Sequence, residues 1–237
     1  MNGFADLKMR LEELPAIRKG RAHEGHYSQF YKKACAAKET LLKVSVALPL
    51  ARSVLPTPEY TEAQKKIDLA AKSAKRLAEK LLADPDAIGE KTTEKNFIGL
   101  TESAELSLIS CKKGWEGQLG AKTRVWEDIA VVVLKLGSAD GAGAIKSQAQ
   151  KLSDAVHSLK DAATRLPRTD LDASNVRSKL TALTDSVSGL DLNTPFGKFL
   201  QAAASPSGAS LELLQQEEVF KAIDKHQLQK VFRVRIF

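Results

Sequence analysis

Apolar residues recur every seven positions across one long segment, and this heptad pattern limits the possible fold more than any other feature. One set comprises Tyr27, Ala34, Leu41, Leu48 and Leu55, and a second set comprises Phe30, Ala37, Val44 and Ala51. Alternating steps of three and four residues place both sets on one face of an α-helix, where they can pack against a neighbouring helix. Residues 27–55 are therefore predicted to be helical. Pro49 is the expected weak point because proline donates no backbone hydrogen bond.

A second helix is predicted directly after the first. The sequence Leu55-Pro56-Thr57-Pro58 cannot continue a helix, and Thr57 is a suitable N-cap with Pro58 at the first helical position. Apolar residues then recur at helical spacing, at Tyr60, Ala63, Ile67, Ala70, Ala74, Leu77 and Leu81. Because the turn is short, the two helices are predicted to be antiparallel neighbours, which makes residues 27–83 a helical hairpin.

The same layout returns nearer the C-terminus with different residues. The first apolar series comprises Ile145, Ala149, Leu152, Val156, Leu159, Ala163 and Leu166, and the second comprises Ala173, Val176, Leu180, Leu183, Val187 and Leu190. Pro167-Arg168-Thr169-Asp170 turns the chain between them. We predict a second helical hairpin by similarity of layout, without an internal sequence repeat.

The segment between the two predicted hairpins has a weaker pattern. Residues 93–111 keep helical spacing, but Gly114, Gly117 and Gly120 predict a turn between helices. The β-branched run 129–134 suits a buried helix or a strand, and the helical spacing of its neighbours favours the helix. The glycine-rich run 137–143 is the best candidate for a hinge.

The last residues change from helical to strand spacing. A short helix is predicted after Pro195, and a further helix over about 210–224. Phe232, Val234 and Ile236 then alternate with two arginines, which is typical of a strand. A single strand is not stable alone, so it must pair within the chain, with a second copy or with a partner's sheet edge, unless these residues form a final helical turn.

Together these patterns predict a mainly α-helical fold. It has two antiparallel helical hairpins in a coiled-coil-like bundle and a small C-terminal helix-plus-strand element. The predicted regions are 1–136, with the basic hairpin 27–83, then 137–192 for the second hairpin and 193–237 for the C-terminal helices and strand. All three could also form one domain.

The formal net charge of +7 comes from one part of the chain. Residues 18–80 contain fourteen basic and six acidic residues, a net of +8, so the remainder carries −1. A basic surface of this kind can neutralise nucleic-acid phosphates without reading sequence, or it can be solvated or face an acidic protein. The candidate nucleic-acid contacts are Arg18, Lys19, Arg21, Lys32, Lys33, Lys65, Lys66, Lys72, Lys75 and Arg76.

Motifs that carry catalytic chemistry are incomplete in this sequence. Residues 114–123 partly resemble a phosphate-binding loop, but Glu116 and Ala121 stand where that loop needs glycines. His23-Glu24-Gly25-His26 has the wrong spacing for a zinc-protease helix. Neither Cys35 nor Cys111 belongs to a CxxC pair, and both are expected to be reduced and structural. We therefore predict no catalytic residue, no metal and no cofactor.

These observations favour a binding role over an enzymatic one. The sequence lacks a run of ~20 apolar residues and an N-terminal secretory pattern, so we expect a cytoplasmic protein without a membrane partner. The first hypothesis is a non-catalytic helical interaction or scaffold subunit that binds other protein subunits or itself. The second is an accessory protein that binds DNA or RNA through residues 18–80. A nucleotide-binding enzyme with its site around 112–124 is the third.

Overall fold

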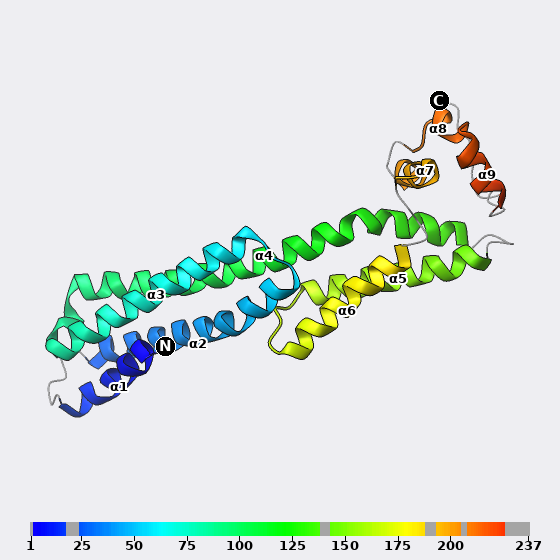
Figure 1. Ribbon diagram of the computed structural model, residues 1–237. Coiled ribbons are helices and arrows are strands. Elements are labelled where there is room, and N and C mark those ends of the chain that lie inside the picture. Colours follow the sequence, from blue (N-terminus) through cyan, green and yellow to red (C-terminus); the bar gives the residue numbers. More distant parts are fainter. Residues whose placement is uncertain (1, 18–23, 138–142, 188–192, 205–207, 226–237) are drawn as a thin grey trace. The chain divides into compact units, whose positions relative to one another are not determined.

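The computed structural model describes residues 2–17, 24–137, 143–187, 193–204 and 208–225, and these are mainly helical (Figure 1). The elements are α1 (Asn2–Ile17), α2 (Glu24–Val54), α3 (Pro58–Ala83), the 3-10 helix η2 (Pro85–Gly89), α4 (Lys91–Gly137), α5 (Gly143–Ala163), α6 (Asp170–Val187), α7 (Pro195–Ala204), α8 (Leu211–Leu214) and α9 (Glu217–Lys225). The predicted mainly α-helical class is confirmed. The predicted terminal strand, with Phe232, Val234 and Ile236, lies outside the described residues.

The chain divides into two compact units. The first contains Met1–Trp115 together with Leu166–Ala173, and the second contains Glu116–Arg165 together with Ser174–Phe237. Helix α4 therefore contributes to the first unit as far as Trp115 and to the second unit after it. The domain boundaries expected after residues 136 and 192 stay predictions.

The core of the first unit is built on the heptad face of α2. Every residue of that face, from Tyr27 to Leu55, is buried. Helix α3 contacts α2 and buries Tyr60, Ala63 and most of its own apolar series. Helix α4 joins this core where Phe97 stacks on Phe30, with ring centroids 4.4 Å apart. The apolar spacing in the sequence therefore identified the faces that pack in this unit.

Helix α1 was not predicted from the sequence, although it belongs to the same core. It packs against both α2 and α3, and its Leu7 and Leu11 are buried. The Tyr31 hydroxyl on α2 donates a 3.0 Å hydrogen bond to Glu12, which raises the pKa of Tyr31 to about 12. The signal for α1 is short: three apolar residues at helical spacing, Phe4, Leu7 and Leu11.

The prolines around the first turn act much as expected. Helix α2 continues through Pro49 and ends at Val54, and Pro58 occupies the first turn of α3. Thr57 is the N-cap residue of α3, but its side chain does not cap the backbone and instead donates to the Glu59 carboxylate. The Arg52 guanidinium spans the turn and donates to the Tyr60 carbonyl at 3.3 Å.

The predicted turn at Gly114, Gly117 and Gly120 is wrong, because all three lie inside the continuous helix α4. Glycine lowers helix stability by only about 1 kcal/mol per residue relative to alanine, so a packed helix can contain several. At Gly114 the neighbouring side chains leave no room for a Cβ atom. A Cβ atom there would lie 2.8 Å from Cε1 of Tyr60 and 2.9 Å from Cγ2 of Thr57. Gly114 therefore lets α4 approach the start of α3 closely.

The second unit contains the rest of α4 with α5 and most of α6. The run 129–134 is helical, as its spacing favoured, and buries Ile129, Ala130 and Val133. Helix α5 buries Leu152, Val156 and Leu159, and Lys160 forms an ion pair with Glu127 of α4. The candidate hinge lies almost entirely outside the described residues, because residues 138–142 are not among them.

Two details of local structure differ from or add to the sequence analysis. The single helix predicted over 210–224 is wrong, since α8 ends at Leu214 and α9 begins at Glu217. At the start of α6, Thr169 and Asp172 form a reciprocal capping box, in which each backbone N–H donates to the other side chain. The backbone N–H of Arg168 also donates to the Asp172 carboxylate at 2.9 Å, and this bond, followed by those from Thr169, holds the pKa of Asp172 below its ordinary value.

The close contact at Gly114 gives a stability prediction. Gly114→Ala should lower the free energy of unfolding by about 1–3 kcal/mol because the new methyl group overlaps Tyr60 and Thr57. Gly99→Ala in the same helix and the same unit is the matched control. Apart from its chain neighbours and the backbone of its own helix, no described atom lies within 4 Å of its added Cβ, so it should raise the free energy of unfolding by about 0.5–1 kcal/mol. Urea denaturation followed by circular dichroism measures both, and equal shifts would contradict the packing described here.

Candidate interaction surfaces

The basic candidates divide between two helices and one undescribed segment. Arg18, Lys19 and Arg21 lie outside the described residues. Lys32 and Lys33 are on α2, and the remaining five, Lys65, Lys66, Lys72, Lys75 and Arg76, are on α3. All seven described candidates are exposed or half-exposed. They are thus accessible to a partner, but they do not form a single row.

Three of the candidates do share one face. Lys65, Lys72 and Arg76 are separated by seven and four residues, so they lie along one stripe of α3 at 3.6 residues per turn. Leu69 lies within this stripe and is 49% exposed. The structure therefore groups these three cations and places Lys66 and Lys75 on other sides of the same helix.

Nearby carboxylates offset part of this charge. Glu62 lies 4.0 Å from Lys65 and 3.5 Å from Lys66, and Glu79 lies 3.8 Å from Lys75. Exposed pairs of this kind contribute only about 0–1 kcal/mol to stability, but their carboxylates also repel phosphate. Among the described residues no carboxylate forms an ion pair with the other four candidates, which are Lys32, Lys33, Lys72 and Arg76.

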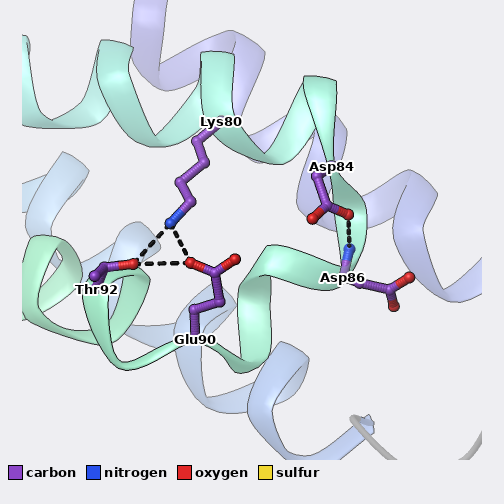
Figure 2. A network of polar contacts seen from close by, with 5 residues as sticks. All are labelled: Lys80, Asp84, Asp86, Glu90 and Thr92. Atoms are coloured by element: carbon purple, nitrogen blue, oxygen red, sulfur yellow. Dashed lines mark hydrogen bonds and ion pairs between the residues drawn. The ribbon is translucent and has the colours of Figure 1, made fainter.

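Lys80, at the end of the basic segment, has a structural role. Its ammonium group donates to Glu90 at 2.6 Å and to the Thr92 hydroxyl at 2.7 Å. Figure 2 shows this group between α3 and the start of α4. Thr92 in turn donates to Glu90 at 2.9 Å. The Lys80 and Thr92 donors hold the pKa of Glu90 below its ordinary value. This network ties the end of α3 to the start of α4 across η2.

A groove lies along α5 and α6 within the second unit. Its volume is about 490 Å³, and its walls comprise Lys151, Asp154, Ala155, Ser158, Lys179, Ala182, Asp185 and Ser186. Four of these are small residues and four are charged, with two of each sign. The Lys179 ammonium donates to the Ser158 carbonyl at 3.3 Å, which joins the two helices beside the groove.

This groove was not predicted from the sequence. The predicted packing faces consist of large apolar residues, whereas the groove is lined by small and charged ones that lie off those series. A signal was present, because the α5 residues are spaced as one helical face and Lys179, Ala182 and Ser186 are spaced as another. What the sequence could not supply was the pairing of the two faces.

The structure shows the surroundings of the residues that partly resemble catalytic motifs. Residues 114–123 are helical, so their backbone amides take part in α4 instead of forming a phosphate-binding loop. Burial raises the pKa of the Cys111 thiol to about 11 and also raises the pKa of Tyr60. Both groups are therefore protonated at neutral pH. Cys35 is half-buried, and within the described ranges no three His, Cys, Asp or Glu side chains are placed to hold a metal ion.

Comparison with known proteins returned no match among family models, curated proteins or solved structures. In the part of the chain that the structure describes, none of the helices has the length and apolar character needed to span a membrane.

The Lys80 network gives a titration prediction. Lys80→Met should raise the pKa of Glu90 towards its ordinary value, because the variant loses the largest cause of the lowering. Since that pKa is lowered in the folded state, the associated stability is present above the unfolded-state pKa and is lost as the pH falls through the folded-state value. NMR titration of the Glu90 carboxyl carbon measures the shift, with Lys95→Met, at an exposed position of α4, as the control. An unchanged Glu90 titration in Lys80→Met would contradict the network.

Proposed function

We propose that this chain is a non-catalytic helical interaction subunit of a larger assembly. Its two helical pairs, α2–α3 and α5–α6, act as hairpins that hold binding faces for other protein subunits. The observation that supports this most is the groove along α5 and α6, because it is an open depression lined by small and charged residues from both helices.

The lining of the groove suits a helix from another protein. Small residues such as Ala155 and Ser186 leave room for a third helix at the usual interaxial distance of about 8–10 Å. Charges of both signs along the groove would favour one orientation of that helix over the reverse. This is the helix-in-groove type of recognition, in which apolar contacts supply affinity and flanking charges supply specificity.

A crosslinking experiment tests this proposal. With a photoreactive residue at Ala182, which lines the groove, the chain should form crosslinks to a protein subunit, whereas the same residue at Thr181, equally exposed but outside the groove lining, should form few. Ala182→Arg should then weaken binding of that purified subunit at least tenfold, because the long cation fills the groove. Thr181→Arg should leave binding unchanged.

Two results would contradict the groove as the binding site. One is equal crosslinking from positions 181 and 182, and the other is unchanged affinity in Ala182→Arg. If the crosslinked subunit is a second copy of the chain, light scattering of the purified protein should show a dimer that Ala182→Arg dissociates, and the interaction is then self-association.

A second candidate function is nucleic-acid binding. It is favoured by four exposed or half-exposed cations without an ion-pair partner among the described residues, namely Lys32, Lys33, Lys72 and Arg76. Phosphate neutralisation requires only accessible positive charge, so this surface would bind DNA or RNA independently of sequence.

A salt titration distinguishes this candidate. The double variant Lys72→Glu/Arg76→Glu should lower affinity for a random duplex at least tenfold and reduce the salt slope by about 2, since each phosphate contact contributes about 0.9. Lys198→Glu/Lys225→Glu makes the same change in net charge outside the basic segment and should have little effect. Equal losses in the two variants, or no binding at low salt, would remove the candidate.

A further inference from the structure

Helix α2 carries a second face, distinct from its heptad face, that α1 covers only in part. Three residues of α1, Phe4, Lys8 and Leu11, line a small recess together with Tyr31, Cys35 and Lys38 of α2 and with Ala34 at the edge of the heptad face. Tyr31 also bonds to Glu12 of α1. The structure thus shows what kind of element fits this face, which is an amphipathic helix lying along α2.

The same face continues beyond Lys38 without a cover. Leu42, Val46 and Pro49 follow at steps of four, four and three residues, which keeps them in line with the part that α1 covers. Leu42 is 38% exposed, Val46 is 49% exposed, and Pro49 is also exposed. Single exposed apolar residues are ordinary in proteins. Three in one row form a continuous apolar strip, and here the strip continues the part of α2 that α1 covers on its N-terminal side.

Pro49 adds a polar feature to this strip. Because proline has no backbone N–H, the carbonyl of Ser45 lacks its usual helical donor. Ser45 is itself exposed and lies between Leu42 and Val46 in sequence. The backbone hydrogen-bond ladder of α2 is therefore interrupted beside the apolar strip.

The charges beside the strip are mainly positive. On one side, Glu39 is neutralised by Lys43 at 2.8 Å. On the other side lie Lys38 and Arg52, two heptads apart, and Arg52 donates to a backbone carbonyl, not to a carboxylate. A second copy of α2 would bring the same positive charges to the strip, whereas an acidic partner would complement them.

We infer that the face formed by Leu42, Val46 and Pro49 binds an amphipathic helix of another protein, in line with α1. The apolar stripe of that helix covers Leu42 and Val46, and its Asp or Glu residues face Lys38 and Arg52. This inference rests on the proposed role as an interaction subunit and adds a second binding face and the chemistry of its partner.

A selection experiment tests the inference with a defined probe. A displayed library of helix-forming peptides is selected on the full chain, with Val46→Glu used for counter-selection. The enriched peptides should have apolar residues at heptad spacing and acidic flanks. A synthesised peptide from this set should bind the chain at least tenfold more weakly after Val46→Glu and also more weakly after Lys38→Glu.

Two control variants separate this face from the other surfaces. Leu82→Glu places the same charge at an exposed apolar position of α3, and it should leave peptide binding unchanged. Ala182→Arg blocks the α5–α6 groove and should also leave it unchanged. A variant that loses subunit binding but keeps peptide binding is therefore altered at the groove alone. A variant that loses peptide binding but keeps subunit binding is altered at the α2 face alone. Circular dichroism checks that each variant is folded.

Three outcomes would overturn the inference. No peptide survives counter-selection with Val46→Glu, or the enriched peptides carry basic or uncharged flanks, or Val46→Glu converts a dimer of the chain into a monomer. The last result would show that a second copy occupies the face.

Discussion

Burial of the heptad face of α2 is the interaction on which the first unit depends. That face brings α3 and the start of α4 into one core, where Phe30 stacks on Phe97, and α1 packs onto the same pair of helices. Apolar burial contributes roughly 25 cal/mol per Å², so a face of nine buried residues is a large share of the driving force for folding. Because this face is committed to the core, only the remaining sides of α2 can bind partners.

The sequence predicted the elements that long apolar series specify and missed those decided by local contacts. The series from Tyr27 and from Tyr60 located α2 and α3, since a seven-residue repeat is unambiguous over several turns. Helix α1 was missed because it carries only two turns of signal. The helix through Gly114 was missed for a different reason: glycine predicts a break in isolation, but here it permits close approach of α3, which only the structure reveals.

The same distinction applies to the candidate surfaces. Counting charges identified residues 18–80 as basic, but it could not show that Glu62 and Glu79 lie beside three of the lysines or that Lys80 ties two helices together. The α5–α6 groove depends on small residues, which carry little weight in any apolar pattern. The net charge of residues 18–80 therefore overstates how many of their cations are available to a partner, since these four lysines lie beside carboxylates.

We propose that helices of this chain bind helices of other proteins. Hydrogen–deuterium exchange of the chain, alone and within its native complex, tests this most directly because it reports each segment separately. Exchange in the complex should be slower at 151–158 and 179–186, which line the groove, and at 39–49 of α2, with little change at 65–76. Unchanged exchange in all of these helices, or slower exchange confined to 65–76, would contradict this proposal.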